Sequence, residues 1–251
     1  MEYNKWAPRY DRIRAEFGFP FEREVAVADL LDSLLPASAP ADPLALLRPL
    51  VEGRTAVVVG LAPRAGPPPL YRLPPAARSP AILAADGATT TCLDAGLVPT
   101  IVVTDLDGPV PAEIAANRRG SVVVIHAHGD NEHALVEWVG QFPGKVVGSW
   151  AGPPRPRILN TGGFTDGDRA AYLADHLGAD RILLWGFDFE HAAATTVPAH
   201  ELKLAKLTWA ERTLGELARD GRAPLYLWRP DGSEVPYPPA RNDESTSYTT
   251  Y

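Results

Sequence analysis

Short apolar runs alternate with helix-like stretches from residue 55 onward, and this alternation constrains the fold more than any other feature. The apolar runs are Thr55–Val59, Ala81–Ala84, Ile101–Val103, Val122–Ile125, Lys145–Val147, Arg181–Trp185 and Leu225–Leu227. The helix-like stretches are Thr89–Ala95, Pro111–Arg118, Glu132–Gln141, Asp168–Leu177 and Ala199–Arg219. Continuous apolar strands that alternate with helices are typical of a parallel sheet buried on both faces. We therefore predict an α/β fold, with a mostly parallel sheet flanked by helices and joined by right-handed crossovers.

The two ends of the chain lack this alternation. The N-terminal part carries helical patterns, with an apolar stripe over Val25–Leu35 and a short helix that begins at Pro43 with Asp42 as its N-cap. The chain after Pro230 is polar and has little to bury, so we expect disorder there. The segments that we interpret as loops or lids are Pro63–Pro80 and Ala151–Arg157. The predicted helical extension, α/β domain and polar tail cover residues 1–52, 53–229 and 230–251.

The composition argues against several classes of protein. The 251 residues carry a net charge of −7, whereas a nucleic-acid-binding surface is basic. No apolar run reaches the ~18 residues of a membrane helix, and the N-terminal residues do not resemble a signal peptide. Cys92 is the single cysteine, so an internal disulfide is impossible, and no Cys/His spacing resembles a zinc site. We expect a cytoplasmic protein without nucleic-acid or membrane partners, and leave a homo-oligomer open as an alternative to a monomer.

Acidic residues follow several of the apolar runs. Asp105 and Asp107 come directly after Ile101–Val103, and their Asp-x-Asp spacing places both carboxylates on the same side of an extended segment. Asp86 and Asp130 follow the neighbouring apolar runs. A solvated turn with a capping aspartate is the alternative for each motif taken alone. Because parallel strands end at one ligand-binding edge, and hard oxygen ligands suit Mg²⁺, we predict a magnesium site there.

Glycines and further acids precede the predicted helix at Asp168–Leu177, in the segment Gly162-Gly163-Phe164-Thr165-Asp166-Gly167-Asp168-Arg169. Free amides at a helix N-terminus bind phosphate, and glycines permit close approach. Capping by Thr165 or Asp166 without a ligand is the alternative. The segment is not a Walker A loop, because the Gly-x-x-x-x-Gly-Lys-Ser/Thr pattern is absent, so a P-loop fold is disfavoured.

Two further motifs each have two interpretations. His126 and His128 have a spacing that suits a transition metal, but without a nearby third ligand we prefer a hydrogen-bonding role. Asp188 lies between Phe187 and Phe189 after another apolar run, where aromatic faces could stack on a heterocycle while the acid accepts from its N–H groups. A core aromatic cluster is the alternative for the two phenylalanines.

Together, these motifs resemble one known family. The motifs are Ala85-Asp86-Gly87-Ala88, Thr104-Asp105-Leu106-Asp107-Gly108, His126-Ala127-His128-Gly129-Asp130-Asn131 and Gly162-Gly163-Phe164-Thr165-Asp166-Gly167-Asp168-Arg169. In order and spacing over residues 55–210, they resemble the archaeal-type 6-hydroxymethyl-7,8-dihydropterin pyrophosphokinases. The N-terminal Trp6-x-Pro8-x-Tyr10 is also similar to that family. More distantly, the first two motifs resemble thiamine pyrophosphokinase, which implies the same kind of α/β catalytic domain.

The resemblance implies a reaction. Diphosphate would pass from ATP to the pterin hydroxymethyl group with Mg²⁺, releasing AMP, within tetrahydromethanopterin or folate-type cofactor synthesis. We predict catalytic roles for Asp105, Asp107 and Asp130, and magnesium ligation by Asp105, Asp107 and Asp166. We predict contacts to ATP or to the pterin alcohol for Asp86, Gly87, Asn131, Gly162, Gly163, Thr165, Asp168, Arg169 and Asp188.

One loop departs from the family pattern. The family tends to have Gly-x-Gly-Pro-Ser-Leu after the first strand, whereas this chain has Gly60-Leu61-Ala62-Pro63-Arg64-Ala65-Gly66, so no contact is carried over to this loop. The alternatives are thiamine pyrophosphokinase, which changes only the acceptor, and a metal-dependent sugar-nucleotide transferase, which also uses Asp-x-Asp. A non-catalytic nucleotide or metal sensor is a further alternative, and the altered loop is the feature that favours it.

Overall fold

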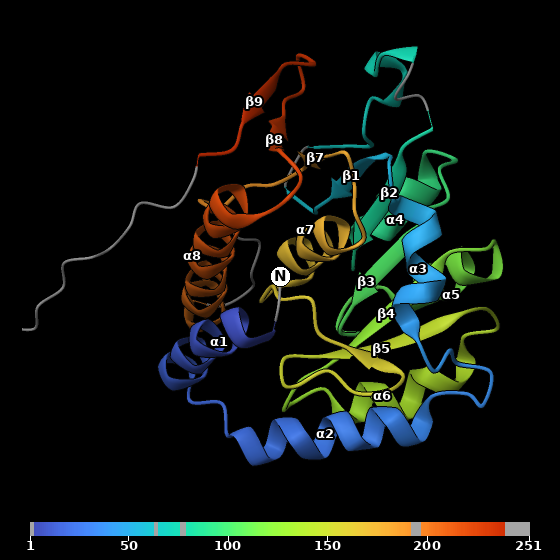
Figure 1. The fold of residues 1–251 in the computed structure, drawn as a ribbon, viewed down its shortest axis with the longest axis vertical. Helices are drawn as coiled ribbons and strands as arrows, with labels where there is room; N and C mark the ends of the chain where they lie inside the picture. The colour runs from blue at the N-terminus through green and yellow to red at the C-terminus, as the bar shows by residue number, and fades with distance from the viewer. Residues whose placement is uncertain (1–2, 63–64, 76–78, 192–196, 239–251) are drawn as a thin grey trace, which may run out of the picture.

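A mostly parallel sheet forms the centre of the protein, as a computed structural model shows for residues 3–62, 65–75, 79–191 and 197–238 (Figure 1). Over these residues the sheet has nine strands in the order β6-β5-β4-β3-β2-β1-β7-β8-β9. The strands are β1 (Thr55–Val59), β2 (Ala81–Ala85), β3 (Ile101–Thr104), β4 (Val122–Ala127), β5 (Val146–Trp150), β6 (Ile158–Leu159), β7 (Arg181–Trp185), β8 (Leu225–Trp228) and β9 (Glu234–Pro236). Neighbouring strands from β6 to β8 pair in parallel, and β8 pairs with β9 antiparallel. The predicted α/β class is confirmed.

The order of the strands reverses direction beside β1. The chain adds β2 to β6 on one side of β1 and then returns to place β7 and β8 on the other side. In an open α/β sheet, the crevice outside such a switch point is where ligands bind. The loops that follow β1 and β7 therefore flank the expected crevice.

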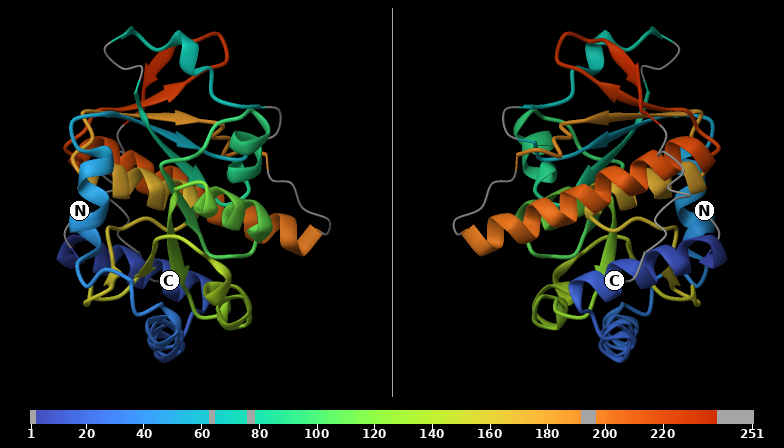
Figure 2. Two further views of the ribbon diagram at one scale, coloured as in Figure 1. Left: turned by 90° about the vertical axis from the view of Figure 1, so that its right-hand side faces the viewer. Right: turned by 90° about the vertical axis from the view of Figure 1, so that its left-hand side faces the viewer.

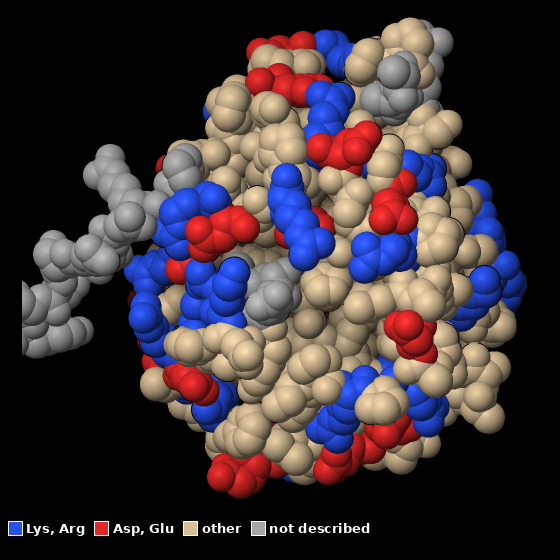
Figure 3. All heavy atoms as spheres, viewed as in Figure 1, with Lys and Arg blue, Asp and Glu red and all other residues tan. Residues whose placement is uncertain are grey.

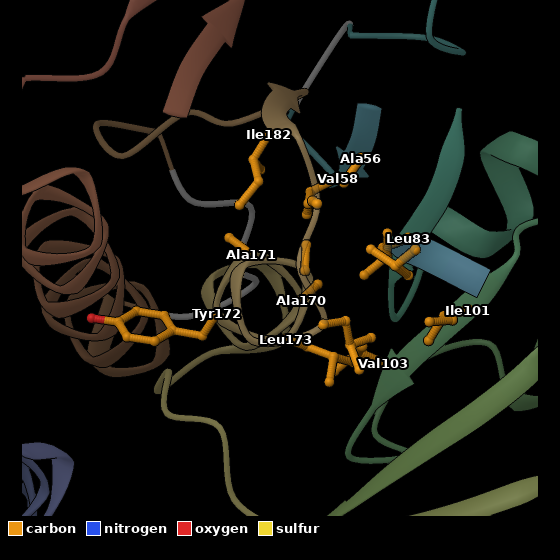
Figure 4. Packing of buried hydrophobic residues seen from close by; sticks show 14 of the residues in the cluster. Ala56, Val58, Leu83, Ile101, Val103, Ala170, Ala171, Tyr172, Leu173 and Ile182 are labelled. Atoms are coloured by element: carbon orange, nitrogen blue, oxygen red, sulfur yellow. The ribbon is translucent and has the colours of Figure 1, made fainter. Parts of the chain in front are cut away.

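Helices cover both faces of the sheet. One face packs on α3 (Pro43–Val51), α7 (Asp166–His176) and α8 (Val197–Asp220), and Figure 4 shows α7 side chains against strand residues such as Val58 and Leu83. The other face packs on α2, α4, α5 and α6, whose bounds are Phe21–Leu34, Ala88–Asp94, Val110–Arg118 and Glu132–Trp138. Both faces of the strands are thus buried, which explains their continuous apolar runs.

The N-terminal helix α1 (Tyr3–Phe17) lies beside α8 in Figures 1 and 2. Trp6 and Ile13 are buried in an apolar cluster with Phe164 and Trp209 of the α/β part. Arg9 adds ion pairs to Glu216 and Asp220 on α8, the latter at 3.2 Å, and Figure 2 shows α8 running across one side of the molecule. The N-terminal helices therefore pack against the α/β part.

Most predicted elements are found, with a few corrections. Asp42 caps α3 as predicted, because its carboxylate accepts from the Leu44 and Ala45 amides. Strands β6 and β9 were not predicted from the sequence, because β6 has two residues and β9 lies in a polar segment. Tyr237 is buried beyond β9, so the chain stays ordered after residue 230 instead of becoming disordered there, and residues 239–251 lie outside the described part.

The surface and the helices also bear on the predicted partners. On the face shown in Figure 3, Lys and Arg side chains are interspersed with Asp and Glu over the described residues. No helix in the described part of the chain is long and apolar enough to cross a membrane.

Candidate active site

The predicted acidic turns meet at the C-terminal edge of the sheet. Asp86 follows β2, Asp105 and Asp107 follow β3, Asp130 follows β4, and Asp166 begins α7. All five side chains line one cavity of about 360 Å³, which we call the acidic cavity. Its other lining residues are Tyr10, Phe19, His128, Phe164, Thr165, Arg169, Leu202, Lys203, Lys206 and Leu207.

The turn after β3 is held in an unusual backbone conformation. Leu106 has a φ of 69°, which is rare for a non-glycine residue, and its buried side chain anchors the turn. The Thr104 hydroxyl accepts from the Leu106 amide at 2.9 Å and lies 3.4 Å from the Asp86 carboxylate. A Cβ atom on Gly108 would lie 2.1 Å from that carboxylate. The glycine of this motif is therefore needed for Asp86 to reach the turn.

Asn131 fixes the position of Asp105 from the neighbouring turn. Its side-chain amide donates to the carbonyls of Asp105 and His126, both at 2.8 Å, and its oxygen accepts from the His128 amide at 3.1 Å. The Asn131 side chain is therefore bonded to the protein backbone through both its amide nitrogen and its oxygen, and it positions the turn.

His128 joins two of the acids. Its Nε2 lies 3.2 Å from the Asp105 carboxylate, and its Nδ1 pairs with Asp130. Burial alone would lower the imidazole pKa, but the hydrogen bonds and charges of Asp105 and Asp130 raise it to about 9. His128 is therefore an imidazolium at neutral pH. His126 instead points to Ser149, with 2.9 Å between Nδ1 and Oγ, so the two histidines do not share a ligand, in agreement with the preferred hydrogen-bonding role.

The carboxylates of this cavity differ in their ionisation. Burial opposes ionisation of Asp105, but hydrogen bonding and charge from His128 hold its pKa below the usual range. Burial, together with repulsion from Asp105 and Asp86, raises the pKa of Asp107 to about 6. Burial and the charge of Asp105 also raise the pKa of Asp166. Such mutual repulsion is what a bound cation would relieve.

The oxygen donors fit Mg²⁺ held partly by a substrate. Among the described residues, no three Asp, Glu, His or Cys side chains come together as a complete metal-binding group. Mg²⁺ in phosphoryl-transfer sites is commonly held by one or two carboxylates plus phosphate oxygens and waters. The Asp105 and Asp107 pair, which is joined by a 3.3 Å hydrogen bond from the Asp107 amide to the Asp105 carboxylate, meets that requirement.

A second cavity opens beside the first. It has a volume of about 550 Å³ and lies between the loops that follow β1 and β7, so we call it the switch-point cavity. Leu61, Phe187 and Asp188 are among its lining residues. The residues that line both cavities are Asp86, Thr165, Asp166, Lys203 and Leu207. The two cavities therefore meet at the carboxylates.

Comparisons with known proteins agree with this arrangement. A family model described as "6-hydroxymethylpterin diphosphokinase MptE-like" matches residues 41–193. Proteins named 6-hydroxymethyl-7,8-dihydropterin pyrophosphokinase from Pyrococcus furiosus, Methanothermobacter thermautotrophicus and Methanocaldococcus jannaschii are 36%, 35% and 32% identical to this chain. The alignments cover 90%, 91% and 86% of this chain and 98%, 100% and 96% of those proteins. The chain belongs to the MptE-like family.

The resemblance predicted from the motifs is thus confirmed. The segment that matches the MptE-like model contains all the acids of the acidic cavity and also Arg169. The guanidinium of Arg169 lies 3.1 Å from the Asp166 carboxylate, so it brings positive charge to the carboxylate edge. Lys203 and Lys206 come from α8, beyond the matched segment, and reach the same cavity.

Some predicted ligand residues lie away from both cavities. Asp168 is fully buried and accepts four hydrogen bonds, from Phe164, Thr165 and Thr213. Gly162 and Gly163 have φ values of 94° and 92°, and a Cβ on Gly163 would lie 2.5 Å from the Arg169 backbone. These residues build the N-terminus of α7. By contrast, Gly87 and Asp188 line the switch-point cavity, together with Asp86 and Asp166.

Several residues at the site were missed in the sequence. Glu113 on α5 is fully buried, and burial together with the nearby Asp86 raises its pKa to about 9, so it is a neutral acid behind Asp86. Tyr10 and Phe19 reach the acidic cavity from the N-terminal segment. The motif Trp6-x-Pro8-x-Tyr10 drew attention to Tyr10 only through its family resemblance, and Phe19 belongs to no motif. The tertiary fold brings both residues to the strand ends.

We expect the Asn131→Ala variant to be both less active and less stable. The substitution leaves the carbonyls of Asp105 and His126 without their donor, which costs roughly 2 kcal/mol. Activity should fall about 10-fold, because Asp105 loses its fixed position. Thermal unfolding and turnover measured on the same preparation test this. A variant with unchanged stability and activity would show that Asn131 does not position the turn.

Proposed function

We propose that the protein transfers diphosphate from ATP to the hydroxymethyl group of 6-hydroxymethyl-7,8-dihydropterin and releases AMP. The observation that carries this proposal is the meeting of two cavities at Asp86 and Asp166, beside the Asp105 and Asp107 pair, in a member of the MptE-like family. The names of its relatives supply the substrate class. The product would enter pterin cofactor synthesis of the tetrahydromethanopterin or folate type.

Positioning and charge neutralisation are the main tasks of the site in such a reaction. The hydroxymethyl oxygen attacks the β-phosphorus of ATP, the bond from that phosphorus to the α,β-bridging oxygen breaks, and AMP leaves. Asp105 and Asp107 would hold Mg²⁺, which supplies charge neutralisation at the phosphate oxygens. Arg169 and Lys206 line the same cavity and add positive charge there.

We assign the orientation of the attacking hydroxyl to Asp130. Its side chain is 78% exposed and lines the acidic cavity, and its pKa is lowered by the hydrogen bond from His128. The ionised carboxylate can accept a hydrogen bond from the hydroxymethyl group. His128 contacts both Asp130 and Asp105, so it holds the Asp130 carboxylate near the Asp105 and Asp107 pair.

A product assay tests the proposal directly. Purified protein, ATP, Mg²⁺ and the pterin alcohol should yield AMP and pterin diphosphate in equal amounts, resolved by chromatography. Excess EDTA should abolish turnover, and Mg²⁺ added beyond the chelator should restore it. ADP as the nucleotide product, or AMP formed without the pterin, would contradict the proposal. Thiamine in place of the pterin, and a nucleotide sugar in place of ATP, serve as the comparison reactions.

A further inference from the structure

The acidic cavity and the switch-point cavity share carboxylates, so each could hold one of the two substrates. The proposed reaction, on which this inference rests, brings together two substrates that each carry a planar heterocycle. We infer that the adenosine part of ATP binds in the switch-point cavity, and that the pterin ring binds in the acidic cavity against Tyr10 and Phe19. The N-terminal helices are then the wall of the acceptor site.

The topology favours the nucleotide in the switch-point cavity. The loops after β1 and β7 flank it, at the place where the strand order reverses and where open α/β sheets bind their ligands. At about 550 Å³ it is the larger of the two, as the larger substrate requires. Leu61 is 63% exposed and lies over Gly87, so an apolar surface is available to a ring at this end of the cleft.

The acidic cavity has the wall that a flat, neutral bicycle needs. Tyr10, Phe19 and Phe164 line it, and Phe19 stacks on Phe17 with ring centroids 5.5 Å apart and planes 16° from parallel. Leu202 of α8 is 50% exposed and also lines the cavity. Aromatic and aliphatic side chains of this kind bury a heterocycle by stacking and by apolar contact.

A hydrogen-bonded chain ties this wall to the catalytic turn. The Tyr10 hydroxyl donates to buried Glu24 on α2 at 3.0 Å, and the second Glu24 oxygen accepts from the Gly129 amide at 3.2 Å. Arg23 donates to the Gly129 carbonyl at 2.8 Å. Because Gly129 lies between His128 and Asp130, α1 and α2 are fixed relative to the carboxylate that orients the hydroxyl.

Most of the acceptor wall comes from segments on either side of the MptE-like match. Tyr10, Phe19 and Leu202 line the acidic cavity from outside residues 41–193, whereas Phe164 lies inside that range. Helix α8 serves both cavities, because Lys203 and Leu207 line the switch-point cavity as well.

The test compares Phe19→Ala with Leu61→Ala. For Phe19→Ala we expect the KM for the pterin to rise roughly 10-fold, because the stacking face is lost, with the KM for ATP within twofold of wild type. Leu61→Ala should show the reverse, with the KM for ATP raised several-fold and the KM for the pterin retained. A higher KM for ATP in Phe19→Ala, or equal changes for both substrates in either variant, would overturn the assignment.

Binding measurements separate this inference from the proposed reaction. α,β-Methylene-ATP is inert at the bond that the reaction breaks, so calorimetry can measure its binding, and the binding of the pterin, to each variant alone. Phe19→Ala should weaken only the pterin, and Leu61→Ala only the nucleotide analogue. If the two variants show this pattern, and the wild-type protein binds both compounds but makes no AMP, the proposed function is contradicted and the assignment of the cavities is kept.

A second variant tests the assignment if Phe19→Ala fails to fold. Phe19→Leu keeps apolar bulk against Phe17 and removes only the ring face. It should unfold at the wild-type temperature and raise the KM for the pterin about threefold, while the KM for ATP does not change. A folded Phe19→Leu variant with wild-type values for both substrates would overturn the placement of the pterin.

Discussion

The Asp107→Asn variant should lose at least about 100-fold in turnover while its stability stays the same or rises. The loss corresponds to about 2.7 kcal/mol of transition-state stabilisation, which follows if this carboxylate helps to hold Mg²⁺ on the phosphates. Stability should not fall, because burial and repulsion from Asp105 and Asp86 raise the pKa of Asp107 to about 6. Above that pH the charged form opposes folding, and asparagine removes the charge.

The opposite changes in activity and stability make this prediction specific. Turnover at saturating substrates and thermal unfolding at pH 7.5 without Mg²⁺ are the two measurements. Asp94→Asn is a matched control, because Asp94 is exposed at the end of α4 and the same charge is removed there. Asp94→Asn should retain both activity and melting temperature. Turnover of Asp107→Asn within twofold of wild type would remove Asp107 from the site.

The sequence predicted the strands well because their burial is nearly complete. Every residue of β1 to β5 is buried, so most of these strands appear as apolar runs. The exception is β5, which continues through Gly148 and Ser149 to Trp150, beyond the predicted run Lys145–Val147. β6 is too short to leave such a run, and β9 has exposed residues. The helix predicted from Asp168 begins at Asp166, where Thr165 is the N-cap. The start of this helix was therefore predicted two residues too late.

Some residues of the candidate site could also be predicted from the sequence, and others could not. Asp105 and Asp107 could be placed together because both directly follow the same buried strand, which ends at Thr104. The predicted extended segment was wrong, since the positive φ of Leu106 turns the chain between the two acids. Gly162 and Gly163 were interpreted as a phosphate loop, whereas their positive φ values, and the close approach of Gly162 to Tyr172 and of Gly163 to the Arg169 backbone, give them a packing role. Tyr10 belongs to a motif that resembles the family, but neither its spacing nor that of Glu113 predicts a place in the site. Their places beside the acids depend on how α1 and α5 pack, which only the fold decides.

The Asp168→Ala variant should lose about 3–5 kcal/mol of the free energy of unfolding. Asp168 is fully buried and accepts from the amides of Phe164 and Thr165 and from the hydroxyls of Thr165 and Thr213, so alanine leaves buried donors without an acceptor. For a chain of this size the melting temperature should fall by roughly 10 °C.

Thr213→Val provides the matched control for that loss. It removes one donor to Asp168 and keeps the other three hydrogen bonds, so it should cost only about 1 kcal/mol. In both variants the affinity for α,β-methylene-ATP, measured well below the melting temperature, should stay near the wild-type value, because Asp168 is fully buried and lines neither the acidic cavity nor the switch-point cavity. The sequence motif alone predicts the opposite, since it assigns Asp168 to the nucleotide. Lost affinity with an unchanged melting temperature would therefore return Asp168 to the binding site and leave its buried hydrogen bonds without a role in stability.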